Sequence, residues 1–168
     1  MRFINRSVAI CWAALMLIFA APHAVAEQKA SVLERISGTW TATGNSFGEN
    51  VKSRMVWSPV LAGRFHRIDY QIMIDPKKAQ SFTGVGHYKA TDEQRTTGYW
   101  ADNGGDLHPL SVEFEDNAIV SIWGVAGKKQ GRTEYRMTAA DRLMVTDWLL
   151  TASGWREFNR AEFVREPS

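Results

Sequence analysis

Ten short, strand-like segments separated by turns constrain this sequence more than any other feature. The segments are rich in β-branched and aromatic residues, and turn-forming pairs such as Gly104-Gly105 and Ser153-Gly154 lie between them. The predicted strands are Thr39–Asn45, Val51–Pro59, Arg64–Ile74, Ser81–Ala90, Arg95–Ala101, Leu110–Glu115, Ala118–Val125, Arg132–Thr138, Arg142–Leu150 and Trp155–Arg165. Because no crossover helix separates them, the sequence predicts an all-β fold, an up-and-down antiparallel β-barrel of about ten strands.

Only the segment before the first strand is predicted to be helical. In Glu27–Ile36, the apolar residues Val32, Leu33 and Ile36 recur at helical spacing, and Gly38 follows as a stop signal. No linker, low-complexity tract or internal repeat follows. We therefore expect one β-barrel domain over residues 27–168, with a short N-terminal helix.

The first 26 residues have the pattern of a secretory signal peptide. Arg2 and Arg6 precede an apolar run from Val8 to Ala21, and Ala24 and Ala26 form the small-x-small pattern of a cleavage site. The run is short for a membrane span and no stop-transfer segment follows it, so cleavage near Ala26 is expected rather than an uncleaved anchor. The prediction is a periplasmic or secreted protein with no membrane span in its mature part.

Composition excludes several classes of function. Cys11 is the one cysteine and would leave with the signal peptide, so the mature chain would have no disulfide, thiol nucleophile or thiolate metal site. Loss of Arg2 and Arg6 would leave 18 basic and 18 acidic residues among the remaining 142. Balanced charge without a basic cluster does not favour nucleic acid as a partner.

Strict alternation predicts which side chains point into the barrel. Gly84 and Gly86 fall on the inner face of the fourth predicted strand, where they would leave room inside or let the strand bend. The inward-facing residues expected to bind a ligand are His66, Tyr70, Tyr88, Trp100, Trp123, Tyr135 and Glu157.

Two motifs at the ends of the predicted barrel resemble a known signature. Gly38-Thr39-Trp40 opens the first strand, and Arg165 ends the last strand, which a closed barrel places beside the first. Arg165 over the Trp40 ring would close this end of the barrel, with a cation–π attraction of about 1 kcal/mol. The pair resembles the signature of the calycin superfamily, which includes the lipocalins and the fatty-acid-binding proteins.

Three further segments resemble a bacterial family of secreted, lipocalin-like proteins of unknown function. They are Gly63–Tyr70, Phe82–Tyr88 and Gly98–Asp102. That family is similar in its barrel to nitrobindin, a haem-binding relative of the fatty-acid-binding proteins, and the resemblance implies an internal cavity. Where nitrobindin holds its haem with a histidine, this chain has Asn159–Phe163 without one. No cofactor is therefore predicted, and haem is disfavoured.

The chain shows no recognisable catalytic or metal-binding motif. Gly44–Gly48 matches Gly-x-Ser-x-Gly, but a nucleophile elbow needs a helix after it and an α/β sheet around it, so a polar hairpin is expected. His66, His87 and His108 lack the spacing of a zinc site. The acidic segment Asp102–Asp106 lacks the length and closing glutamate of a calcium loop and is predicted to be a turn.

Asp147 and Glu157 are the remaining candidates for acid–base chemistry. Alternation places both inside the barrel on neighbouring antiparallel strands. Two inward carboxyl groups would need a basic partner or raised pKa values. An arginine partner or exposure at the barrel mouth is expected, and general acid–base catalysis is the alternative.

The expected function is therefore the binding or carriage of a small apolar or amphipathic molecule inside the barrel. One alternative is a barrel enzyme, a hydrolase or isomerase, that uses His66 or the Asp147/Glu157 pair, which must then converge. Another is a structural module of the envelope with a filled core and an exposed aromatic patch at Trp57, Trp148 or Trp155.

Overall fold

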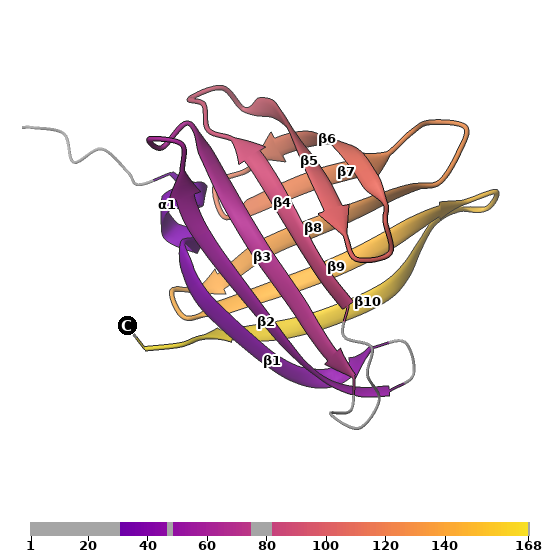
Figure 1. Cartoon of the computed structure of the whole chain (residues 1–168), viewed down its shortest axis with the longest axis horizontal. Helices are drawn as coiled ribbons and strands as arrows, with labels where there is room; N and C mark the ends of the chain where they lie inside the picture. The colour runs from indigo at the N-terminus through magenta and orange to yellow at the C-terminus, as the bar shows by residue number, and fades with distance from the viewer. Residues whose placement is uncertain (1–30, 47–48, 75–81, 168) are drawn as a thin grey trace, which may run out of the picture.

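The computed structural model describes residues 31–46, 49–74 and 82–167, which form one short helix and ten antiparallel strands (Figure 1). The elements are α1 (Val32–Ile36), β1 (Gly38–Ser46), β2 (Glu49–Val60), β3 (Phe65–Ile74), β4 (Phe82–Lys89), β5 (Arg95–Asp102), β6 (Leu107–Phe114), β7 (Ala118–Gly124), β8 (Gln130–Ala139), β9 (Arg142–Thr151) and β10 (Gly154–Arg165). Each strand pairs with its neighbours in sequence, and β1 pairs with β10, so the barrel is closed. The predicted up-and-down barrel is confirmed, with strand ends within three residues of those expected.

The helix α1 covers one end of this barrel (Figure 1). It begins with a capping box in which the Glu34 amide donates to Ser31 Oγ (3.2 Å) and the Ser31 amide donates to the Glu34 carboxylate (2.7 Å). Its apolar residues Val32, Leu33 and Ile36 are buried in the barrel core. The predicted residues before Ser31 lie outside the described part of the chain. The helix is held to the β6–β7 turn by Arg35, which donates to the Asn117 side chain (3.0 Å).

The predicted contact between Trp40 and Arg165 closes the same end. Trp40 is fully buried, and its Nε1–H donates to the Ile36 carbonyl at 2.8 Å. The Arg165 guanidinium lies 4.1 Å from the centre of the Trp40 ring and donates to the carbonyls of Ser37 and Arg35. Gly38 has φ of +127°, and a Cβ at that position would meet the Arg165 guanidinium at 2.7 Å, so the motif requires glycine there.

Three aromatic rings form a layer across the barrel below this end. The ring centre of Trp57 lies 5.0 Å from that of Tyr88 and 5.2 Å from that of Tyr135, and all three side chains are buried. Trp57 was a candidate for an exposed aromatic patch, and that prediction is wrong because Trp57 is only 1% exposed. Trp155 is exposed, whereas Trp148 lies against the Arg132 guanidinium at 4.6 Å.

Glycines inside the barrel accommodate tryptophan rings. A Cβ at Gly84 would overlap the Trp100 ring, and a Cβ at Gly131 would overlap the Trp123 ring. Each ring therefore lies against the backbone of the neighbouring strand. A side chain in place of either glycine would push the ring away. The space that Gly84 was expected to leave inside the barrel is thus filled by Trp100.

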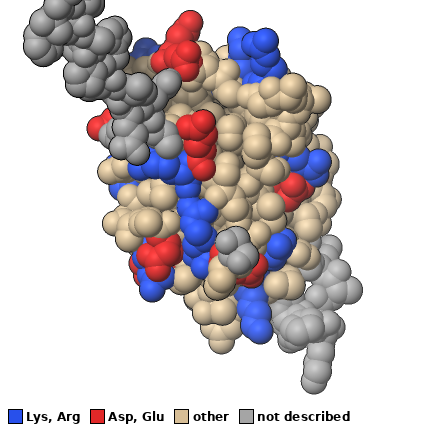
Figure 2. Space-filling view, turned by 90° about the vertical axis from the view of Figure 1, so that its left-hand side faces the viewer, with Lys and Arg blue, Asp and Glu red and all other residues tan. Residues whose placement is uncertain are grey.

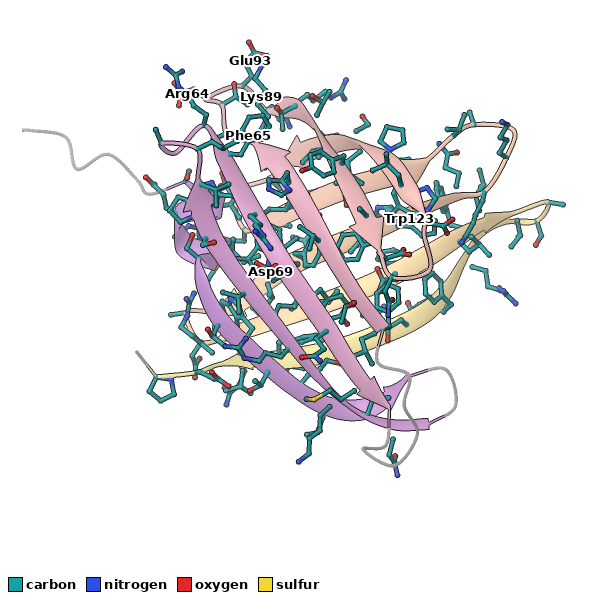
Figure 3. All side chains as sticks on the ribbon, viewed as in Figure 1. Arg64, Phe65, Asp69, Lys89, Glu93 and Trp123 are labelled. Carbon is teal, nitrogen blue, oxygen red and sulfur yellow. The ribbon has the colours of Figure 1, made fainter. Side chains whose placement is uncertain are left out.

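The outer surface carries charges of both signs. On the side where α1 lies, basic and acidic side chains are interspersed (Figure 2). Arg64, Lys89 and Glu93 gather at the β2–β3 and β4–β5 turns, and Asp69 lies on the outside of β3 (Figure 3), where it accepts a hydrogen bond from Arg67. In the described residues, no helix is long and apolar enough to cross a membrane.

Two sequence predictions concern residues at the edge of the described chain. The signal peptide over residues 1–26 lies wholly outside the described residues and stays a prediction. The Gly44–Gly48 motif lies in the β1–β2 hairpin, where Ser46 pairs with Glu49 across residues 47–48, which are not described. Because this hairpin joins two antiparallel strands, it is the polar hairpin that was expected rather than a nucleophile elbow.

Candidate ligand-binding site

A cavity of about 440 Å³ lies inside the barrel, between the aromatic layer and the end opposite α1. Asp102, Asp106 and Lys129 line its mouth at the β5–β6 and β7–β8 turns. Its wall is mostly apolar: Tyr70, Ile72, Phe82, Tyr88, Trp100, Leu110, Trp123, Tyr135, Val145, Leu149 and Phe158. A mostly apolar cavity of this volume with a few polar groups is typical of a site for a small molecule. The alternative of a filled core is therefore wrong.

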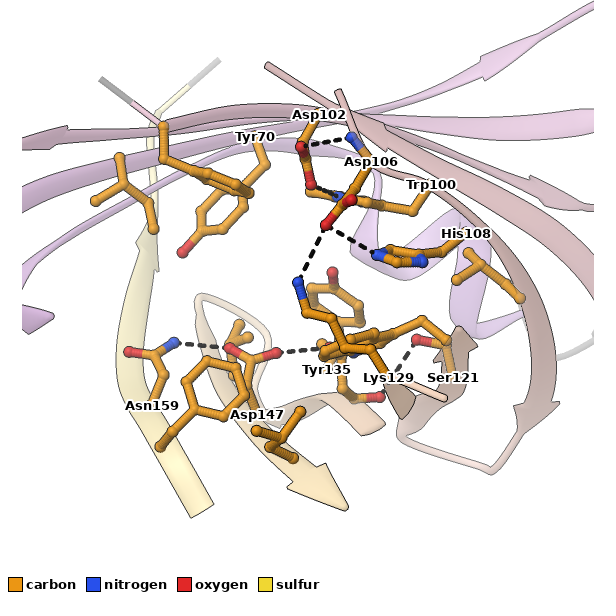
Figure 4. Close-up of a pocket in the computed structure, with 18 of the residues that line it drawn as sticks. Tyr70, Trp100, Asp102, Asp106, His108, Ser121, Lys129, Tyr135, Asp147 and Asn159 are labelled. Carbon is orange, nitrogen blue, oxygen red and sulfur yellow. Dashed lines mark hydrogen bonds and ion pairs between the residues drawn. The ribbon is translucent and has the colours of Figure 1, made fainter. Parts of the chain in front are cut away.

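Most of the residues predicted to contact a ligand lie together on this wall. Figure 4 shows Tyr70, Trp100 and Tyr135 around the cavity. Tyr88 and Trp123 complete the group. They come from β3, β4, β5, β7 and β8, and strand alternation points each of them inward.

His66 is not part of this wall. It is a buried side chain (7% exposed) on β3, paired across the sheet with Pro59 and Tyr88 near the closed end of the barrel. Burial lowers the pKa of the His66 imidazole, because removal from water disfavours its charged form. The prediction that His66 contacts a ligand in the cavity does not agree with this position.

Glu157 points out of the barrel, and the prediction that it faces inward is wrong. A β-bulge shifts the register of β10, so that Glu157 pairs with Trp148 while Asn159 pairs with Asp147. The extra residue, Phe158, reverses the alternation on one side of the bulge. Glu157 therefore lies outside, where Arg160 donates to both of its carboxylate oxygens at 2.9 and 2.6 Å.

Asn159, which shares its strand face with Ala161 and Phe163, lies beside Asp147 inside the cavity. Asn159 Nδ2 donates to Asp147 Oδ2 at 2.8 Å, and the Thr133 hydroxyl donates to Asp147 Oδ1 at 2.6 Å (Figure 4). Trp123 Nε1–H in turn donates to Thr133 Oγ1 at 3.2 Å. An indole N–H can only donate, so the Thr133 hydroxyl must accept from it and direct its own proton to Asp147. This chain of donors fixes the orientation of the carboxylate.

Asp147 has no cationic partner among the described residues, although an arginine partner or exposure at the barrel mouth was expected for the Asp147/Glu157 pair. Its pKa is raised, mainly because the barrel interior removes it from bulk water; the hydrogen bonds from Thr133 and Asn159 partly oppose this shift. Burial likewise raises the pKa of Tyr70, raises that of Tyr88 to about 12, and raises that of Tyr135 well above its ordinary value. The phenols around Asp147 therefore stay neutral at physiological pH.

The ion pairs of the cavity lie at its mouth and not beside Asp147. Lys129 Nζ lies 3.0 Å from Asp106 Oδ2, and His108 Nε2 lies 3.5 Å from the same oxygen. Lys129 holds the pKa of Asp106 below its ordinary value. Arg156 also lines the cavity and is exposed to solvent.

The predicted turn over Asp102–Asp106 is present. Asp102 Oδ1 accepts from the backbone amide of Gly104 at 2.9 Å, and Asp102 Oδ2 accepts from Trp100 Nε1 at 3.2 Å. The carboxylate thus serves the turn and the adjacent tryptophan. Across the described part of the chain, no group of three or more His, Cys, Asp or Glu residues has an arrangement that could hold a metal ion.

The residues proposed for a hydrolase or isomerase do not come together in the structure. Asp147 lies inside the barrel and Glu157 outside it, so the two carboxyl groups do not converge. His66 lies beyond the cavity wall.

Several cavity residues were missed in the sequence. Thr133 lies two positions from Tyr135 and could have been found by extending the alternation along β8. His108 lies two positions from the inward Leu110, but the predicted strand began only at Leu110. Asn159 could have been found by alternation back from Phe163 and Ala161, whereas Phe158 was hidden by the bulge, which has no sequence signature here.

Comparisons with known proteins support the fold and do not address the activity. No protein-family model and no curated protein sequence matches this chain. Among solved structures, it is similar to the S-type phycobiliprotein lyase CPES from Guillardia theta, with a TM-score of 0.54 and 16% sequence identity. The match covers 83% of this chain and 95% of that chain. At this identity the similarity shows a shared lipocalin-like barrel and does not extend to activity.

Proposed function

We propose that this protein binds one small amphipathic molecule in the interior of its barrel, to carry or sequester it. The observation that carries the proposal is the cavity of about 440 Å³, which has an aromatic wall, an open end and a fixed polar cluster around Asp147 in its interior. An apolar wall provides affinity through burial, while a few convergent polar groups orient the ligand.

The barrel architecture suits such a role because its two ends differ. Trp40, Arg165 and α1 stabilise one end without contributing to the cavity, which opens toward the other end, where the β5–β6 and β7–β8 turns contribute Asp102, Asp106 and Lys129 to its lining. Ligand entry would therefore not require the core to open.

A cavity-filling substitution tests the proposal directly. Leu149 lines the cavity, whereas its neighbour Leu150 is 42% exposed on the outside of the same strand. We expect Leu149→Trp to abolish ligand binding by occupying the space, and the matched control Leu150→Trp to bind like the wild type. Binding would be followed by the fluorescence of Trp100 and Trp123 in delipidated protein, titrated with a fatty acid, a retinoid and haem. Equal binding by both variants would place the ligand elsewhere.

The panel also addresses the cofactor. Haem is included because the chain lacks a histidine in Asn159–Phe163 but has His108 in the cavity wall. We predict no haem Soret shift. Native mass spectrometry of protein purified from its own source would identify a small molecule that stays bound.

We further propose that the protein acts in the periplasm or outside the cell. The support is the signal-peptide pattern of residues 1–26 and the resemblance of Gly63–Tyr70, Phe82–Tyr88 and Gly98–Asp102 to secreted bacterial lipocalin-like proteins related to nitrobindin. N-terminal sequencing of the exported protein should begin at Glu27. An intact Met1 in the mature protein would contradict this placement.

A further inference from the structure

We propose that the ligand carries a cationic amine, and that Asp147, held in place by Thr133 and Asn159, is the group that binds it. This inference rests on the proposed function and specifies the chemistry of its ligand. It is built on the position of one carboxylate inside an otherwise apolar cavity.

The Asp147 carboxylate retains unused acceptor capacity toward the cavity. An ionised carboxylate has about four lone-pair sites, and the described contacts are one hydrogen bond from Thr133 and one from Asn159. Both donors lie on the strands that flank β9, so they hold the carboxylate from the side of the wall. The remaining acceptor sites are available to a ligand.

The positive groups of the cavity are not arranged to neutralise Asp147. Lys129 is paired with Asp106 at the mouth, and Arg160 is paired with Glu157 on the outside of the barrel. Arg156 lines the cavity but forms no ion pair with Asp147. A carboxylate desolvated without a counter-ion is unfavourable, so a site of this kind favours a ligand that supplies the missing positive charge.

The aromatic wall adds to this preference. Tyr70, Tyr135 and Phe158 line the same cavity as Asp147. Their ring faces carry partial negative charge, which attracts an ammonium group, particularly one removed from water. An anionic head group would meet the opposite environment beside Asp147, and would be more stable near Arg156 or Lys129.

Three probes with one naphthyl ring test the inference: 1-naphthylmethylamine, 1-naphthalenemethanol and 1-naphthoate. Isothermal titration calorimetry on the delipidated protein should show the amine binding about 10- to 100-fold more tightly than the alcohol, the range expected for a hydrogen bond to a charged group. Asp147→Asn should remove this preference while the alcohol keeps its affinity. The control variant Glu157→Gln, which loses a carboxylate outside the barrel, should retain the preference.

Each other outcome has a distinct meaning. Equal binding of amine and alcohol, or an amine preference that survives Asp147→Asn, overturns the inference and leaves the proposed function standing. Tightest binding of naphthoate overturns it too, and points to Arg156 or Lys129 as the polar contact. Binding of none of the three probes, with no molecule retained in native mass spectrometry, contradicts the proposed function itself.

Proton release gives a second readout that a neutral hydrogen bond would not produce. An ammonium beside Asp147 stabilises its ionised form, so across a pH series amine binding should release the Asp147 proton wherever the free protein holds it, seen as a buffer-dependent binding enthalpy. The other titratable groups around the cavity are Tyr70, Tyr88 and Tyr135, which stay neutral, and Asp102, Asp106, His108, Lys129 and Arg156 at or near the mouth. The release should therefore disappear in Asp147→Asn and persist in His108→Gln; the reverse result would contradict the role of Asp147.

Discussion

The two ends of the barrel use the same residue types for opposite purposes. At the closed end, Trp40 is fully buried, its N–H is satisfied by Ile36, and Arg165 caps its ring. At the open end, Trp123 and Trp100 are only partly buried, and their rings face a cavity. The closed end thus maximises packing and stability, while the open end gives up packing to leave space for a ligand. Both ends are rich in aromatic residues. They differ because protein atoms surround the Trp40 ring, whereas the Trp100 and Trp123 rings border the cavity.

The largest expected effect is at the closed end. Trp40→Ala removes a fully buried ring and its contact with Arg165, and we expect it to lower the free energy of unfolding by about 3–5 kcal/mol. Trp155→Ala, at an exposed position, is the matched control and should change it by less than about 0.5 kcal/mol. Urea titration measures both. Similar losses in the two variants would remove the distinction between the ends.

A smaller effect is expected at Asp147, and its sign depends on pH. Because the pKa of Asp147 is raised in the folded protein, its protonated form is stabilised by folding, and this stability is lost as the pH rises through the folded-state pKa. Relative to Asp147→Asn, the wild type without ligand should therefore lose stability as the pH rises. Urea titrations of both proteins across a pH series measure this difference.

Glu157→Gln supplies the contrast for that series. Arg160 lowers the pKa of Glu157, so this carboxyl stabilises the fold above its ordinary pKa, and its loss cannot produce a gain at high pH. If Asp147→Asn and Glu157→Gln followed the same pH profile, the inside and the outside of the barrel would not differ electrostatically.

The smallest effect concerns the mouth. Lys129 and Asp106 join the β7–β8 and β5–β6 turns through an exposed ion pair, which contributes little to stability. Lys129→Met should leave the urea midpoint unchanged but speed the dissociation of 1-naphthylmethylamine, because the pair lies across the exit. Stopped-flow tryptophan fluorescence measures this rate. A large loss of stability with no change in rate would assign the pair a structural role instead.

The sequence predicted the parts of the fold that follow from alternation and turn chemistry. The Trp40–Arg165 contact joins the two ends of the domain and was found because closure places the first and last strands together. Tyr70 and Trp100 were placed correctly because their strands are regular.

The polar part of the site could not be predicted in the same way. One extra residue at Phe158 turns Glu157 out of the barrel and brings Arg156 to the cavity, and nothing in the sequence of β10 marks this insertion. Alternation also cannot tell how far along the axis a residue lies, which is why His66 was assigned to a cavity that it does not reach. Depth depends on where the aromatic layer fills the barrel, and that follows from packing in three dimensions.

Gly84 and Gly131 influence the volume of the cavity although each is covered by a tryptophan ring. Each lies beneath a tryptophan whose ring rests on bare backbone, so a single added methyl group at either position would tilt that ring toward the axis. The width of the cavity can therefore be changed by substitutions beneath the residues that line it. Barrels of this kind that differ only at these two glycines would accept ligands of different size, although the residues that contact the ligand are identical.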